Sequence, residues 1–555
     1  MSNNVFLMIT INCIFRLNKS KNLKMSKKLI FPVTIVILLT LGIFIGMKIQ
    51  NAVSDDKNSS QVKKFNDALE VTSRYYVDDV DSQKLTEDAI KGMLEGLDPH
   101  SVYISADQLK KVNEDFQGSF EGIGVEFDII NDTLTIVSPI NGGPSEKLGI
   151  LAGDKIVKID GQNCVKIARD DVPKKLKGPK GTKVVVTIVR SGMEKPLEFE
   201  IIRDKIPIYS VDAHFMYNED IGYVKISRFA ATTYDEFMKA MAEMKSQGMK
   251  KVVLDLRSDP GGYLDQAFKI SSEFIPAGQK IVYTKSRIKD FNEEYVSEGG
   301  TYTEIPLIVL VNGGSASASE IVSGAVQDWD RGLIVGENTF GKGLVQRQFD
   351  LPDGSAFRVT TARYYTPSGR LIQKPYEGSK YNASTTANVQ GDNLEHKNDI
   401  QDSTRPAFKT MGGRTVYGGG GITPDFIIKM DTLTDYTVQL RRLNLIYIYT
   451  ENYMSNNRSR IESEYKTIND FRNNFTVTES MLEDLKTLAR EKDIVFNEEQ
   501  FNNDVDYIKT SIKFQIARDI WGNNGSYSVW VDTDEQFLQG IKLFDEAVKL
   551  SSLKQ

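Results

Sequence analysis

Short apolar stretches alternate with amphipathic stretches of helical period between residues 221 and 336. Residues 232–247, 264–274 and 316–328 have the helical spacing, and the apolar stretches around them read IGYVKI, KVVLDL, PLIVLV and LIVGE. Strands that are apolar at nearly every position are buried on both faces, as in a parallel sheet covered by helices. The pattern predicts an α/β core, placed at residues 205–434, with its chemistry where the strands end.

Other patterns flank this core. Short strands of alternating hydrophobicity fill residues 113–204, interrupted by one helical stretch at 170–176, which predicts a compact β-rich module. Helical spacing predicts a small helical region at residues 55–112 and a helical extension at 435–555. The polar stretch 379–404 is typical of an insertion loop within the core.

Residues 29–47, LIFPVTIVILLTLGIFIGM, contain no charge and are long enough to cross a membrane as a helix. Basic residues gather in the tail 1–28 before this stretch, so the positive-inside rule places the tail in the cytoplasm and exports the rest. A cleaved signal peptide, which would release the protein to the periplasm, is the alternative. The run Met25-Ser26-Lys27-Lys28 would itself be a natural start, so an over-extended reading frame at residues 1–24 is expected as an alternative to a start at Met1.

Composition excludes several kinds of site. The chain has 69 Lys+Arg against 75 Asp+Glu, and its net charge of −6 argues against nucleic-acid binding. Cys13 and Cys164, its two cysteines, lie on opposite sides of the apolar run 29–47, which argues against a disulfide or a Cys-rich zinc site. We expect no metal and no cofactor. Three histidines leave few candidates for a Ser-His-Asp triad.

Two glycine-flanked runs follow neighbouring strands of the expected core. The run GGSASASE, residues 313–320, comes between a strand and a helix, where small residues can expose a nucleophilic serine beside backbone N–H groups. Alone, such serines are more often helix N-caps. Lys342 lies between Gly341 and Gly343 after the next strand. A lysine in a dry pocket has a lowered pKa and can act as a general base, although an ordinary turn lysine is the alternative.

A third run, Ser258-Asp259-Pro260-Gly261-Gly262, ends the strand KVVLDL. Its glycine pair either brings backbone N–H groups to a developing oxyanion or forms an ordinary turn. Its place at a strand end in the same layer as the serine run favours the functional reading.

Together these runs resemble the carboxyl-terminal processing proteases, also called tail-specific proteases, a Ser/Lys family with a PDZ domain ahead of the catalytic core. The resemblance covers about residues 76–425. It is carried, in order, by AIKGMLEGLDPHS, GIGVEF, GGPSEKLGILAGDKIVKIDG, VVLDLRSDPGG, GGSASASE, VGENTFGKGLVQ and GGGGITPDF.

The resemblance implies roles for five residues. Ser317 is the expected nucleophile and Lys342 the expected base, with Gln346 hydrogen-bonding and orienting the lysine. The backbone amides of Gly262 and Ala318 are the expected oxyanion donors. The family usually has asparagines ahead of the glycine pair, so this chain departs from it there.

The β-rich module is similar to a PDZ domain. The resemblance implies that Gly122, Ile123, Gly124 and Val125 form a loop whose N–H groups hold a peptide carboxylate while the peptide adds a strand to the sheet. Apolar side chains in this run favour tails with an apolar last residue. The expected fold is thus an α/β protease core with an inserted PDZ domain, an N-terminal transmembrane helix and helical N- and C-terminal extensions.

The function expected is that of a membrane-anchored serine endopeptidase on the extracytoplasmic side of the inner membrane. It would recognise the C-terminal tails of exported proteins and cleave them through an acyl-enzyme; a homodimer or an adaptor protein is left open. One alternative is a catalytically inactive PDZ adaptor or scaffold at the membrane. Another is a Ser-His-Asp hydrolase that uses His100 or His214, which separate replacement of each histidine would reveal.

Overall fold

A computed structural model describes residues 59–552 except 131, 141, 191, 379, 382–394, 397–404 and 431. The chain divides into two compact units, residues 1–90 and 91–555. The expected transmembrane helix at 29–47 and the tail before it lie outside the described residues. Among the helices that are described, none combines the length and apolar character that a membrane crossing needs.

The described part of the first unit is helical. Helix α3 (Ser59–Tyr75) has no buried residue, and α4 (Ser82–Glu95) begins in this unit and continues into the second. Helices in this stretch agree with the expectation for residues 55–112.

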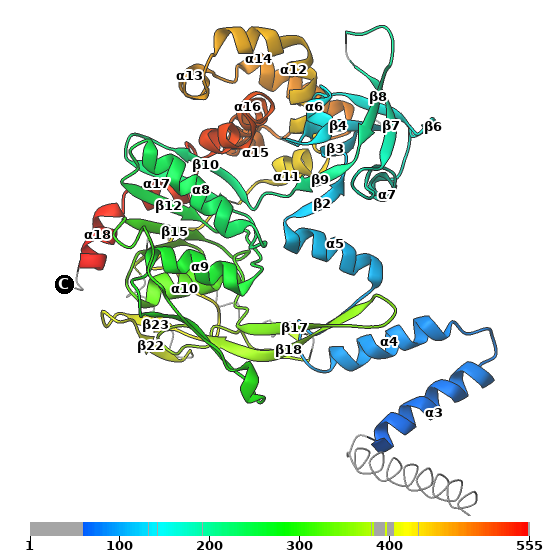
Figure 1. Cartoon of the computed structure of the whole chain (residues 1–555). Coiled ribbons are helices and arrows are strands. Elements are labelled where there is room, and N and C mark those ends of the chain that lie inside the picture. Colours follow the sequence, from blue (N-terminus) through cyan, green and yellow to red (C-terminus); the bar gives the residue numbers. More distant parts are fainter. Residues whose placement is uncertain are drawn as a thin grey trace, which may run out of the picture. The chain divides into compact units, whose positions relative to one another are not determined.

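A seven-stranded sheet forms the centre of the second unit (Figure 1). The five central strands are parallel, and an antiparallel strand closes each edge. This confirms the largely parallel α/β core. In order across the sheet the strands are β10 (Val211–Met216), β11 (Ile221–Ile226), β12 (Lys251–Asp255), β15 (Leu307–Val311), β16 (Leu333–Gly336), β24 (Phe426–Ile427) and β21 (Glu395–His396).

Helices cover both faces of this sheet, because alternate residues of each strand point to opposite sides. Leu254 and Val309 belong to an apolar cluster with α8 (Thr233–Ser246), α9 (Leu264–Phe274) and α10 (Ala318–Asp328). Val253 and Leu310 belong to a second cluster with Phe537 and Phe544, from α17 (Glu535–Ile541) and α18 (Phe544–Ser552). Helices α17 and α18 therefore form a layer of the α/β core.

A second, antiparallel sheet carries the hairpin that follows Lys342. The hairpin strands are β17 (Leu344–Asp350) and β18 (Ala356–Tyr365), and β18 also pairs with β1 (Val102–Ile104) and β13 (Lys280–Lys285). β14 (Glu294–Val296) completes this sheet. Three small strand pairs occur elsewhere: β2 (Ser119–Gly122) with β9 (Asp204–Pro207), β19 (Tyr376–Glu377) with β20 (Lys380–Tyr381), and β22 (Ala407–Lys409) with β23 (Thr415–Tyr417).

The β-rich module has its own sheet and its own apolar core. Among the described strands, β3 (Val125–Ile130) pairs with β4 alone and lies at the edge of this sheet. The helix α5 (Ala106–Gln117) precedes the module. The remaining elements of the module are β4 (Thr133–Pro139), α6 (Pro144–Lys147), β5 (Lys155–Ile159), β6 (Gln162–Asn163), α7 (Val172–Leu176), β7 (Lys183–Val189) and β8 (Leu197–Ile202).

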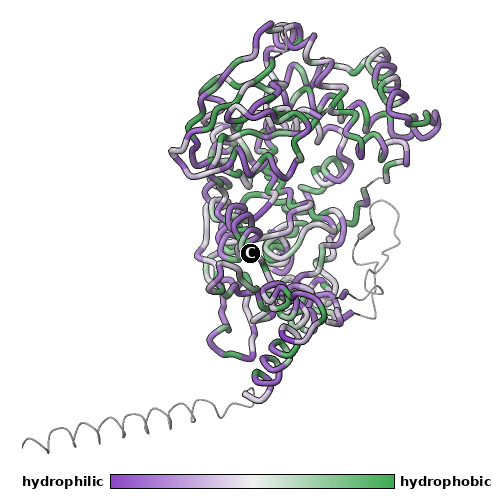
Figure 2. Tube along the Cα trace, turned by 90° about the vertical axis from the view of Figure 1, so that its right-hand side faces the viewer, coloured by the Kyte–Doolittle hydropathy of each residue, from purple (hydrophilic) through white to green (hydrophobic). Residues whose placement is uncertain are grey.

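Residues 435–530 form a helical domain with a separate apolar core. In Figure 2, polar and apolar residues alternate along this domain, as they do along the rest of the described chain, which is expected when each element buries one side. The domain consists of α11 (Asp435–Arg442), α12 (Leu445–Glu464), α13 (Ile468–Asn474), α14 (Glu479–Glu491), α15 (Glu498–Asn503) and α16 (Val505–Trp530).

Candidate active site

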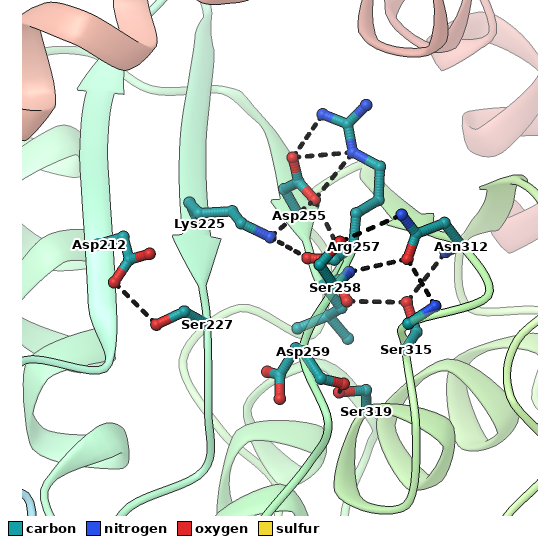
Figure 3. Close-up of polar contacts among 12 residues, drawn as sticks. Asp212, Lys225, Ser227, Asp255, Arg257, Ser258, Asp259, Asn312, Ser315 and Ser319 are labelled. Atoms are coloured by element: carbon teal, nitrogen blue, oxygen red, sulfur yellow. Dashed lines mark hydrogen bonds and ion pairs between the residues drawn. The ribbon is translucent and has the colours of Figure 1, made fainter. Parts of the chain in front are cut away.

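Ser317 is the one serine of its run that is not buried. Ser315 and Ser319 are fully buried, and both hydroxyls donate to backbone carbonyls of the loop after β12, those of Leu256 (2.8 Å) and Asp259 (3.0 Å) (Figure 3). Ser317 is partly exposed at the N-cap of α10. Its φ of 53° and ψ of −106° are uncommon for a residue other than glycine, as at strained turns that present a nucleophile.

Glu320 connects the Ser317 turn with the Lys342 turn. Its fully buried carboxylate accepts hydrogen bonds from the backbone N–H groups of Ser317 (2.8 Å), Gly341 (2.6 Å) and Lys342 (2.9 Å) and from the Thr339 hydroxyl (2.5 Å). Burial raises the pKa of Glu320 to about 7, although these hydrogen bonds oppose the rise. One side chain thus fixes two turns that lie more than 20 residues apart in the sequence.

Tyr364 of β18 provides a second connection. Its buried hydroxyl lies 2.6 Å from the Lys342 carbonyl oxygen and 3.1 Å from that of Ser317, so its hydrogen is shared between the two turns. Sequence reasoning missed both connections. Glu320 was part of a quoted run without a role, and Tyr364 carried no signal.

The glycines beside Lys342 are required by close packing. A Cβ on Gly341 would lie 3.0 Å from the Gly421 nitrogen, and one on Gly343 would lie 2.9 Å from the Gln373 nitrogen. Burial lowers the pKa of Lys342 from its ordinary 10.5, and the Arg358 cation lowers it further. A lysine in this setting is more easily neutral, and a neutral amine can accept a proton.

Gln346 does not hydrogen-bond Lys342 in this structure, contrary to the expectation. Its amide nitrogen donates to the Thr360 hydroxyl (3.2 Å), which in turn donates to Asp98 (3.0 Å). The Ser101 hydroxyl also donates to Asp98 (2.6 Å). The side-chain oxygen of Gln346 accepts no hydrogen bond from the described residues. The run DPHS, which belongs to the family resemblance, contributes Asp98 and Ser101 to this network.

Neither histidine that was considered for a triad hydrogen-bonds Ser317 among the described residues. The His100 Nε2 atom contacts the Tyr381 hydroxyl, and burial followed by the nearby Lys342 cation lowers the His100 pKa to about 4. His214 Nε2 lies 2.8 Å from a Glu243 oxygen.

The glycine pair after β12 lies against the Ser317 turn. A Cβ on Gly261 would be 2.7 Å from the Ala318 nitrogen and 2.9 Å from the Ser317 Cβ, so no other residue fits there. Gly262 forms a parallel β-bridge with Phe229. The hydrogen bonds of this bridge are made by the residues on either side of Gly262, so its own N–H is not used in the bridge. Neither the Gly262 N–H nor the Ala318 N–H donates to a described group, so both are available to an oxyanion beside Ser317.

Charged side chains at the carboxyl ends of β11 and β12 form ion pairs that hold these strand ends together (Figure 3). Arg257 binds Asp255 (2.6 Å) and Asp534 (2.6 Å), and Lys225 lies 3.4 Å from Asp255. Burial alone would raise the Asp255 pKa, but these two cations hold it far below its ordinary value. Through Asp534, the segment before α17 supports the loop that carries the glycine pair.

Asp259 predicts a pH-dependent stability. It is fully buried, accepts the Gly261 N–H (2.7 Å), and burial raises its pKa to about 7. A carboxyl whose pKa is raised on folding contributes most below its unfolded pKa of about 3.9, and this contribution is lost as the pH rises through about 7. Asparagine does not titrate, so Asp259→Asn removes that pH-dependent loss. The melting temperature of the variant minus that of wild type should therefore be more positive at pH 8 than at pH 5.

Thermal unfolding at both pH values measures this difference, with the exposed Asp170→Asn as control. A difference between Asp259→Asn and wild type that is independent of pH would contradict the assignment.

The expected carboxylate loop of the β-rich module has unused donors. The Ile123 carbonyl accepts from Ser145, and the Gly124 carbonyl accepts from Ile140 (3.0 Å), whereas neither residue's N–H donates to a described group. Gly124 has a φ of +73°. Free N–H groups with occupied carbonyls are typical of an anion-binding backbone nest.

Four family models match the chain. They are peptidase family S41 at residues 220–380, a PDZ domain at 135–190, the N-terminal domain of the activating protease CtpB at 45–108, and a family of unknown function at 436–522.

The chain is also similar to curated proteins and to a solved structure. The carboxy-terminal-processing protease of Bartonella bacilliformis is 41% identical over 349 residues, which cover 61% of this chain and 80% of that protein. The carboxy-terminal processing protease CtpA of Bacillus subtilis is 35% identical over 357 residues, 63% of this chain and 76% of that one. The photosystem II D1 C-terminal processing protease structure is 31% identical with a TM-score of 0.32, and the match covers 56% of this chain and 89% of that chain.

Proposed function

Because the chain belongs to the carboxy-terminal-processing serine proteases of peptidase family S41, we propose that Ser317 and Lys342 form its catalytic dyad. The observation that carries this proposal is the double connection of their turns by Glu320 and Tyr364. Two buried side chains that hold a partly exposed serine and a partly buried lysine in register favour joint chemistry over two unrelated turns.

In the first half of the reaction the neutral Lys342 amine takes the Ser317 hydroxyl proton as the oxygen attacks the scissile carbonyl carbon. The negative charge that develops on the carbonyl oxygen is stabilised by the N–H groups of Gly262 and Ala318. The C–N bond then breaks, and the Lys342 ammonium returns the proton to the leaving amine.

In the second half a water molecule attacks the acyl-enzyme ester and Lys342 takes one of its protons. The ester bond breaks, Ser317 recovers its hydroxyl hydrogen from Lys342, and the product leaves with a new carboxyl terminus. Gln346 would assist by accepting a hydrogen bond from Lys342 through its side-chain oxygen.

We further propose that substrates are captured by their C-terminal tails at the PDZ domain. The free N–H groups at Ile123 and Gly124 would bind the terminal carboxylate, and the tail would add a strand to β3. Ile123 is buried, and Val125 and Phe127 pack against the module's core, which suits an apolar last residue. The substrate class is therefore protein tails with an apolar C-terminus.

Amidation of such a tail should weaken its binding about tenfold or more, because a charge-assisted hydrogen bond contributes roughly 1.5–3 kcal/mol. Fluorescence anisotropy of a labelled peptide on the Ser317→Ala chain measures the affinity without turnover. The free acid should bind more tightly than its amide, and both should bind a Gly124→Val variant poorly, since its φ of +73° disfavours a β-branched residue. Equal affinity of acid and amide for the Ser317→Ala chain would refute capture through the carboxylate.

We also propose that residues 29–47 anchor the enzyme, with the catalytic part on the extracytoplasmic side of the inner membrane. The uncharged run and the basic tail before it support this. Alkaline extraction of membranes should leave the full chain in the pellet; its release would support a cleaved signal instead.

A further inference from the structure

A cleft of about 490 Å³ lies between the PDZ edge strand and the C-terminal helical domain. Residues 125–128 of β3 line one side, together with Arg169 of the 3₁₀ turn η1 (Arg169–Asp171) that precedes α7. Asn444, Tyr447, Gln515 and Arg518 line the other side. A volume of this size is within the range of ligand-binding clefts. The PDZ groove of this chain therefore has a second wall, supplied from more than 300 residues away.

Polar contacts hold this wall at the outward face of β3. The Arg518 guanidinium lies 2.6 Å from a Glu126 carboxylate oxygen, and the Asn444 amide donates to Asp128 (3.2 Å). In Figure 1, α12 and α16 accordingly lie beside β3 and β4. Both pairs are on the side of β3 opposite to Val125 and Phe127, which pack against the PDZ core.

The direction of an added tail follows from the geometry of β3. A tail held by its carboxylate at the start of β3 runs antiparallel to that strand, and directly opposite residues of paired strands place their side chains on the same face. The last tail residue, opposite Val125, therefore faces the PDZ core. The residue before it, opposite Glu126, faces the helical domain.

From this placement we propose that the C-terminal helical domain reads the penultimate residue of the substrate tail, with Arg518 as its contact. The inference rests on the proposed tail capture by the PDZ domain and deepens it. It assigns a specificity role to the segment that matches a family of unknown function.

The side chains that line the cleft include hydrogen-bond donors that are not used within the described part of the chain. Arg518 and Arg169 each carry five N–H donors, and each makes a single hydrogen bond, to Glu126 and to Asp128, among the described residues. An acidic penultimate side chain can use the unoccupied donors of Arg518. Glu126 lies directly opposite that side chain, and its carboxylate repels a second carboxylate there. This repulsion limits the preference for an acidic penultimate residue.

Two peptides that differ only in a penultimate Glu or Gln, with the same apolar free-acid terminus, test the proposal on the full Ser317→Ala chain. The Glu peptide should bind about three- to fivefold more tightly, the range of a partly exposed charge pair. Arg518→Gln should abolish this ratio and leave the affinity of the Gln peptide nearly unchanged. Glu126→Gln should increase the ratio, because it frees Arg518 and removes the opposing charge.

Arg460→Gln is a matched control, because Arg460 lies exposed on α12 and does not line the cleft. Since the Arg518–Glu126 pair is partly exposed, its loss should not unfold the chain, which circular dichroism checks. Suppose the free acid still binds better than its amide, but the Glu and Gln peptides bind with equal affinity or Arg518→Gln leaves their affinity ratio unchanged. The helical domain then does not read the penultimate residue, although capture of the tail by its carboxylate remains supported. If Arg518→Gln tightens both peptides equally, the helices obstruct the groove and the proposal is wrong. If acid and amide bind equally, tail capture fails and the proposal with it.

Discussion

Ser317→Ala should lower peptide cleavage by at least about a thousandfold, roughly 4 kcal/mol of activation free energy. The substitution removes the oxygen that forms the acyl-enzyme and leaves the core intact, because Ser317 is partly exposed and its neighbours Ser315 and Ser319 make the buried hydrogen bonds. Initial cleavage rates of a tail peptide, with circular dichroism to confirm folding, measure the effect.

Ser323→Ala is the matched control, since Ser323 is buried in the same helix and its hydroxyl donates only to the Ser319 carbonyl. It should retain activity within about tenfold. Residual cleavage by Ser317→Ala within tenfold of wild type would exclude Ser317 as the nucleophile, and unimpaired peptide binding without cleavage in wild type would favour an adaptor.

Lys342→Arg should be as inactive as Lys342→Ala, with losses of about a thousandfold or more. Arginine keeps the positive charge but remains protonated, so it cannot take the serine proton. The burial that lowers the Lys342 pKa makes the neutral amine accessible, whereas an arginine guanidinium stays protonated in proteins. The rates of both variants against pH measure the effect.

Lys374→Arg is the control for this substitution. Lys374 lies over the rings of Phe340 and Tyr381, 3.8 and 4.3 Å from their centroids, and an arginine can replace such a cation–π contact. Substantial activity in Lys342→Arg would mean that Lys342 acts through its charge and that the dyad is wrong.

Much of the core was predictable because its signals are local. β15 is apolar at every position and β12 at its three central positions, and their carboxyl ends are followed by the serine and glycine runs, so the edge where the chemistry lies follows from the sequence. Ser317 and Lys342 each sit in a short run of small residues, and the ordered resemblance of several such runs to one family, more than either run alone, pointed to them.

The connections between these runs were not predictable, because they depend on which distant side chains meet in the folded chain. Glu320 in a helix N-terminus and Tyr364 in a strand look ordinary in sequence. Amphipathic spacing showed that residues 435–555 are helical but not which surface they cover, so neither the α17 and α18 layer nor the Arg518–Glu126 pair could be foreseen. The Gln346 contact with Thr360 depends on side-chain rotamers, which no motif specifies.

Trapping of the acyl-enzyme tests the central claim most directly. Wild-type enzyme and a tail peptide are mixed, stopped in acid during turnover, digested, and mapped by mass spectrometry. The account predicts an ester between Ser317 and the N-terminal fragment of the peptide, sensitive to hydroxylamine and absent from Ser317→Ala and Lys342→Arg. An ester on another residue, or the same ester formed at the wild-type rate by Lys342→Arg, would contradict it.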